Sequence, residues 1–150
     1  LRPARSPHPA APARAMIVTL TANLLAEDTF AMPPWAPGRT TRAQAATFQV
    51  GGKGLNVVKM LHRLSHADAE AAAAEAWAAV GGASGEQARA WLAAQPWRTR
   101  LFATATPTRR GLVVRAPGQP ETTFLGPDAP LCAEAVAALA AALAALPPPT

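Results

Sequence analysis

The feature that most constrains the fold is a glycine-rich stretch directly before a predicted helix. Residues 49–61 read QVGGKGLNVVKML, so three glycines and Lys53 separate a strand-like run from a helical pattern. Glycine permits close approach to the backbone, and the amides at a helix N-terminus bind anions. The stretch therefore indicates an anion site, although a plain strand-to-helix turn with a solvated lysine fits the spacing equally well.

The same stretch does not fit a nucleotide-binding P-loop. That motif needs Ser or Thr after the lysine, whereas Gly54 follows Lys53. Asn56 lies one turn into the helix, where its amide can donate to and accept from a sugar hydroxyl, or be merely solvated. Residues 80–86, VGGASGE, repeat the strand, diglycine and helix order. They indicate either a second approach to the same pocket or a plain turn.

Periodicity along the chain predicts an α/β fold. Strand-like runs lie at 16–23, 40–50 and 100–106, helices at 55–64, 85–95 and 132–146, and a β-hairpin at 111–125 that turns at Pro117 and Gly118. This order favours a sheet with additional β pieces projecting from it. The run at 16–23 is predicted to be buried.

Three segments carry more detailed predictions. The helix at 55–64 has Val57, Leu61 and Leu64 on one apolar face, and the helix at 85–95 turns Ala88 and Leu92 inward. The alanine-rich residues 66–82 favour a helix by propensity, although the α/β alternation calls for a strand before the second diglycine.

Composition and charge limit the class of protein. The chain has 150 residues, enough for one domain, and a net charge of +5. Positive charge is concentrated at 39–63 and 98–115, two stretches without acids. If they meet in the fold, they form an anionic-ligand pocket as readily as a nucleic-acid surface. A single cysteine fits a reducing, cytoplasmic setting. Residues 1–15 are predicted to be a disordered leader, and neither a secretion signal nor a membrane span is evident.

Five motifs in order resemble the PfkB (ribokinase-like) family of carbohydrate kinases, within it the branch of 1-phosphofructokinases and tagatose-6-phosphate kinases. They are TLTANLLAEDT at 19–29, VGGKGLNV at 50–57, the glycines Gly81, Gly82 and Gly85, TRRG at 108–111, and ETTFLGPDAPL at 121–131. The resemblance implies that residues 16–150 form the N-terminal half of a ribokinase-like sheet sandwiched by helices. It also implies β lid elements at about 30–50 and 111–125, through which the complete enzyme can form a homodimer.

The resemblance also assigns a substrate site. In such kinases a sugar phosphate receives a phosphoryl group from ATP with Mg²⁺. Carried over by position, Lys53 and Arg109 bind the phosphate already on the sugar, and Gly51, Gly52 and Asn56 line the sugar site. The family's aspartate for sugar hydroxyls aligns with Glu27, and the neighbouring Asp28 is the alternative.

Some features depart from the family pattern. Leu24 replaces a proline, and Gly111 replaces an asparagine. The family's catalytic aspartate, in a G-A-G-D motif, and its ATP-binding part belong to a C-terminal half that is not in this chain. No catalytic or metal-binding residue is therefore predicted, and neither ATP nor Mg²⁺ is expected to bind this chain tightly.

The favoured function is a kinase for a ketohexose phosphate, such as fructose 1-phosphate, fructose 6-phosphate or tagatose 6-phosphate, present as a fragment that is inactive alone. The alternative is a non-catalytic sugar-phosphate-binding module. A nucleic-acid-binding protein ranks third, because the basic stretches lack interleaved aromatic residues and any recognisable binding motif. The expected partner is a small sugar phosphate, not nucleic acid or a membrane.

Overall fold

The structure of the protein, a computed structural model, describes residues 16–65 and 73–147. The leader predicted at 1–15 lies outside these residues. The described chain is an α/β fold with two sheets. β1 (Met16–Thr21), β4 (Ala73–Val80) and β5 (Arg98–Ala103) form a parallel sheet in the order β1-β4-β5. The second sheet has the order β3-β2-β6-β7 and contains β2 (Leu25–Ala31), β3 (Ala45–Gly51), β6 (Arg109–Arg115) and β7 (Thr122–Leu125).

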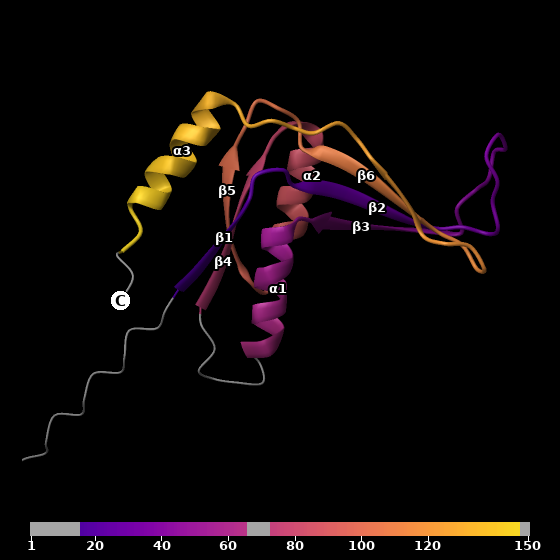
Figure 1. Cartoon of the computed structure of the whole chain (residues 1–150), viewed down its shortest axis with the longest axis horizontal. Coiled ribbons are helices and arrows are strands. Elements are labelled where there is room, and N and C mark those ends of the chain that lie inside the picture. The colour runs from indigo at the N-terminus through magenta and orange to yellow at the C-terminus, as the bar shows by residue number, and fades with distance from the viewer. Residues whose placement is uncertain (1–15, 66–72, 148–150) are drawn as a thin grey trace, which may run out of the picture.

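Helices cover both faces of the parallel sheet, as the fold class predicted. They are α1 (Lys53–Ser65), α2 (Gly82–Ala93) and α3 (Ala133–Ala144). Ala76 and Ala78 of β4 join the core beneath α1 and α2, whereas Trp77 points to the other face and packs with Leu139 of α3. Successive side chains of a strand alternate between faces, so α3 lies opposite α1 and α2 (Figure 1).

The second sheet projects away from the parallel sheet (Figure 1). Its inner strands β2 and β6 are parallel, and each pairs antiparallel with an outer strand. α2 contacts β4 of the first sheet as well as β2 and β3 of the second. This helix therefore fixes one end of the projecting sheet against the body of the fold. Among the described residues, no helix combines the length and hydrophobicity needed to cross a bilayer.

The helix predicted over 66–82 is wrong for residues 73–80, which form β4; residues 66–72 lie outside the described part. β4 is the central strand, paired with β1 on one side and β5 on the other. The hydrogen bonds and burial of that position outweigh the helix propensity of alanine, which is a weak preference. The small side chains of Ala76 and Ala78 also suit a strand that is buried under two helices.

The apolar face predicted for α1 is wrong as well. Val57 and Leu64 are 47% and 55% exposed, while Leu55 and Val58 are buried. The start of the helix is bound to β1, where Thr19 Oγ1 donates to the carbonyl of Gly54. This contact sets the rotation of α1 and turns Leu55 and Val58 toward the core.

β1 is less buried than predicted, and β2 was not predicted as a strand. β1 lies at the edge of its sheet, and α3 contacts β5 at the opposite edge, so Leu20 remains 45% exposed.

The predicted hairpin is confirmed: β6 pairs with β7, and the amide of Gln119 donates to the carbonyl of Ala116 at 3.2 Å. Gly118, with φ +73°, supplies the left-handed position of this turn.

Candidate functional site

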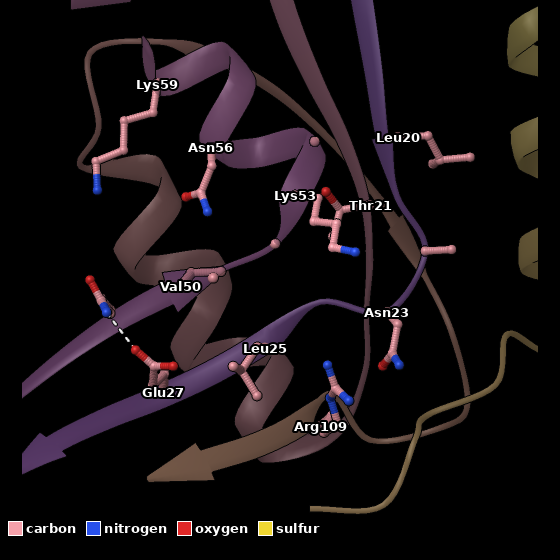
Figure 2. A pocket seen from close by; sticks show the side chains of 15 residues that line it. Leu20, Thr21, Asn23, Leu25, Glu27, Val50, Lys53, Asn56, Lys59 and Arg109 are labelled. Atoms are coloured by element: carbon pink, nitrogen blue, oxygen red, sulfur yellow. Dashed lines mark hydrogen bonds between the residues drawn. The ribbon is translucent and has the colours of Figure 1, made fainter. Parts of the chain in front are cut away.

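A cavity of about 570 Å³ opens between the start of α1 and the near end of the second sheet (Figure 2). Its walls come from four stretches of the chain: the end of β1 with the turn after it, the start of β2, the stretch from the end of β3 into the first half of α1, and the start of β6. The lining residues are Leu20, Thr21, Ala22, Asn23, Leu25, Glu27, Gln49, Val50, Gly51, Gly52, Lys53, Gly54, Asn56, Lys59 and Arg109.

The glycine-rich turn is held against the end of β1. Gly52 has φ +157°, and a Cβ atom there would lie 2.4 Å from Cγ2 of Thr21. The Thr21 hydroxyl accepts a hydrogen bond from the amide of Leu55 at 3.2 Å, so a side chain of β1 caps α1. This close approach places Lys53 and the first amides of the helix at the cavity wall.

Arg109 reaches the same cavity through the second diglycine turn. The amide of Gly81 donates to Thr108 Oγ1 at 3.1 Å, and the amide of Thr108 donates to the Gly81 carbonyl at 2.8 Å. Ser84 Oγ donates to the Thr108 carbonyl at 2.6 Å. Thr108 is buried, and these bonds fix the start of β6, so the next residue, Arg109, lines the cavity.

Glu27 lines the cavity, but Asp28 does not. Glu27 is paired with Gln49 across β2 and β3, and Gln49 Nε2 donates to Glu27 Oε1 at 2.5 Å. Asp28 points to the other face of β2, where it forms an ion pair with Arg110 at 2.8 Å. The structure therefore favours Glu27 over Asp28 as the carboxylate of this site.

Cationic groups lie on two sides of the cavity. In Figure 2, Lys53, Asn23 and Arg109 lie on the right, whereas Lys59 lies at the far left, beyond Asn56. Glu27 is the acidic side chain of the lining. This excess of positive charge suits a ligand with an anionic group, and the amide and carboxylate groups suit hydroxyls.

The structure brings together six of the seven residues predicted for the site: Glu27, Gly51, Gly52, Lys53, Asn56 and Arg109. Sequence reasoning missed Lys59, although it follows Asn56 by three residues and so lies on the same side of the helix. Thr21 and Asn23 belong to a quoted motif but received no role. Within the described ranges, no three His, Cys, Asp or Glu side chains are grouped to hold a metal ion.

Comparison with protein-family models and with curated proteins gives no match. Solved structures do match. Phosphofructokinase-2 from Escherichia coli, in complex with fructose-6-phosphate, has a TM-score of 0.78 and 25% identity over 88% of this chain and 42% of its own. A protein from Thermotoga maritima described as a 1-phosphofructokinase has a TM-score of 0.71 and 20% identity, with 85% of this chain and 40% of its own covered. A protein from Agrobacterium tumefaciens described as a ribokinase has a TM-score of 0.61 and 12% identity, with 77% of this chain and 37% of its own covered.

These likenesses, together with the two sheets and the three helices, define a ribokinase-like carbohydrate kinase fold. This fold agrees with the resemblance to the N-terminal half of PfkB-type kinases that the order of the motifs carries. The chain spans about two fifths of the length of the solved structures that it matches.

Proposed function

We propose that the cavity is the acceptor site of a sugar-phosphate kinase, and that it binds a ketohexose phosphate such as fructose 1-phosphate, fructose 6-phosphate or tagatose 6-phosphate. The observation that carries this proposal is the convergence of Lys53 and Arg109, from distant parts of the chain, on one cavity that also contains Glu27. In this proposal Lys53 and Arg109 bind the phosphate of the ligand. Gly51, Gly52, Asn56 and Glu27 contact the sugar.

In this proposal the described residues bind and orient the acceptor. Phosphoryl transfer depends chiefly on positioning and on neutralising charge, so a fixed phosphate and fixed hydroxyls are the contribution of this part of a kinase. ATP would supply the phosphoryl group in the complete enzyme. As the family resemblance implies, the proposal assigns ATP and Mg²⁺ to the complete enzyme.

Calorimetric titration with the three ketohexose phosphates and with fructose tests the site. The phosphorylated sugars should bind more tightly than fructose. In Lys53→Met, their affinity should fall about tenfold, since a hydrogen bond to a charged group is worth roughly 1.5 kcal/mol. Arg115→Gln is the matched control, because it also removes one positive charge, and Arg115 is paired with Glu121 on the β6–β7 hairpin and does not line the cavity. Equal affinity for fructose and its phosphates would contradict the proposal.

The second candidate is a sugar-phosphate-binding module without catalysis, which the same cavity supports because Lys53, Arg109 and Glu27 all line it. We expect no sugar-dependent ATP hydrolysis or phosphoryl transfer by the 150-residue chain. Measurable turnover would contradict that expectation. A reading frame that continues past codon 150 into a G-A-G-D motif would favour the kinase over the module.

Assembly through the second sheet is part of the same proposal. β7 is an edge strand, and its Phe124 and Leu125 are about half exposed. A second copy of this sheet would cover these side chains in a complete, dimeric kinase. Sedimentation of the complete kinase, compared with a Phe124→Ser variant, should show a dimer that the substitution weakens. An unchanged dimer in that variant would contradict this assignment of the interface.

A further inference from the structure

A carboxylate from outside the cavity lining occupies two of the cavity's polar donors. Asp128, in the loop after β7, accepts a hydrogen bond from Arg109 Nη1 and another from Asn23 Nδ2, each at 2.8 Å and both at Oδ1. The backbone amide of the next residue, Ala129, donates to Asn23 Oδ1 at 3.5 Å. Arg109 and Asn23 lie on the same side of the cavity (Figure 2).

The arginine has few other ways to bind an anion. Its side chain is only 17% exposed, and its Nε is buried, with no hydrogen-bond partner among the described residues. A ligand must therefore approach the outer edge of the guanidinium, which carries Nη1 and Nη2. One N–H group of Nη1 already donates to Asp128. A phosphate that accepts from this same N–H group would take the place of the carboxylate.

The exposure of Asp128 makes this exchange feasible. Its side chain is 78% exposed, and an ion pair with so exposed a partner adds little stability. A phosphate carries more negative charge than a carboxylate and has more acceptor oxygens, so it binds an arginine more strongly. If Asp128 stayed beside the bound phosphate, the two like charges would repel each other.

We propose that Asp128 is an internal competitor for the phosphate of the ligand: its carboxylate occupies Arg109 and Asn23 in the empty cavity, and a phosphate must displace it. This inference rests on the proposed function, in which Arg109 binds a sugar phosphate. It also assigns Asn23 as a second donor to that phosphate. Asp128 thereby holds both donors in place and lowers the affinity of the site for anions.

The competition predicts a specific pattern of affinities. Every ligand whose phosphate enters this subsite displaces the same carboxylate. Removing the charge of Asp128 should therefore raise the affinities for inorganic phosphate and for fructose 6-phosphate by the same factor. We expect roughly threefold to tenfold, the range for an exposed ion pair and the like-charge repulsion combined. Fructose carries no phosphate, so its affinity should not change.

Calorimetric titration of the wild type, Asp128→Asn and Asp128→Ala with inorganic phosphate, fructose 6-phosphate and fructose tests the proposal. The asparagine keeps an oxygen that can accept from Asn23, and the alanine variant removes the contact altogether. Glu121→Gln is the matched control for net charge. It neutralises the carboxylate of another ion pair with an arginine, Arg115–Glu121, which lies outside the cavity. It should leave all three affinities unchanged.

The outcomes separate this inference from the proposed function. If fructose 6-phosphate binds the wild type but binds both Asp128 variants equally or more weakly, the competition is overturned and the sugar-phosphate site stands. If the variants gain affinity for inorganic phosphate but bind fructose 6-phosphate no better than inorganic phosphate, the competition stands and the sugar site is contradicted. If inorganic phosphate binds no variant, or if Glu121→Gln gives the same gain, the competition is overturned.

Discussion

Two turns of this protein share one sequence pattern and differ in their surroundings. Gly51–Gly52 and Gly81–Gly82 each connect a strand of the chain to the helix that follows it. The first turn borders an open cavity and is followed by Lys53. The second is enclosed: a Cβ atom at Gly81 would lie 2.2 Å from the carbonyl oxygen of Thr104 and 2.3 Å from that of Thr106.

The difference shows how a similar backbone motif serves two purposes. Around Gly52 the close neighbour is the side chain of Thr21, and the first turn of α1 faces the cavity. Around Gly81 the close neighbours are backbone atoms, and the amide of Gly81 is bound to Thr108. We infer that the first turn binds ligand and that the second positions Arg109.

The largest expected effect is the loss of stability in Gly81→Ala. The added methyl would overlap two backbone oxygens that cannot move without distorting the sheet, so the free energy of unfolding should fall by roughly 3 kcal/mol. Chemical denaturation measures it. The control is Gly118→Ala, which has a positive φ but open space around its Cβ and should cost only about 1 kcal/mol. Equal losses would show that the second turn is not tightly enclosed.

Gly52→Ala should have a smaller effect on stability and a larger one on binding. Its methyl would meet the Thr21 side chain, which can rotate, and would stand at φ +157°, a conformation that side chains rarely adopt. We therefore expect a loss of about 2 kcal/mol in unfolding free energy. The same rotation breaks the hydrogen bond from Leu55 and shifts the start of α1. Titration with fructose 6-phosphate should then show weaker binding. An unchanged affinity for fructose 6-phosphate would show that the first turn does not bind the ligand.

Thr108→Val tests how the second turn positions Arg109. The substitution keeps the shape but removes the oxygen that accepts from the buried amide of Gly81, which should cost about 1.5 kcal/mol. Denaturation and fructose 6-phosphate titration should both show a loss. If stability falls while affinity for the sugar phosphate is unchanged, the turn supports the fold but does not position Arg109.

The smallest effect is expected for Arg110→Gln. Arg110 forms an ion pair with Asp28 of the neighbouring strand β2 at 2.8 Å and donates to Gln87 of α2 at 3.3 Å, and about half of its side chain is exposed. Removing an exposed ion pair should lower the unfolding free energy by less than about 1 kcal/mol. Fructose 6-phosphate affinity should stay unchanged, because Arg110 does not line the cavity. A large loss of affinity would mean that the wrong arginine had been assigned to the ligand.

Sequence reasoning succeeded where a local pattern decides the structure. The turn at Pro117 and Gly118 determines the hairpin, and the spacing of Ala88 and Leu92 matches the buried side of α2. The glycine-rich motif and its resemblance to a kinase family predicted the fold class and selected residues that the structure places around one cavity. The first two signals lie within a few residues of the features that they predict, and the resemblance adds the order of five motifs along the chain.

Sequence reasoning failed where contacts between residues distant in the sequence decide the structure. Alanine propensity cannot indicate that 73–80 is the central strand between two others, and periodicity alone could not orient α1, whose start is bound to Thr19 and Thr21. The choice between Glu27 and Asp28 depends on which face of β2 points to the cavity, which the alignment of motifs left open. The ion-pair partner of Arg109 is Asp128, in the loop after β7 and distant from it in sequence.

The most direct test of the central claim is the titration of ¹⁵N-labelled protein with fructose 6-phosphate, followed through its backbone amide resonances. The account predicts that the amides of Gly51 to Asn56 shift, with saturation, while those of Gly81 to Gly85 move little. Fructose at the same concentrations should produce much smaller shifts. Saturable shifts confined to the second turn, or no shifts at the first turn in a folded sample, would contradict the assignment of a phosphate-binding role to the Gly51–Gly52 turn.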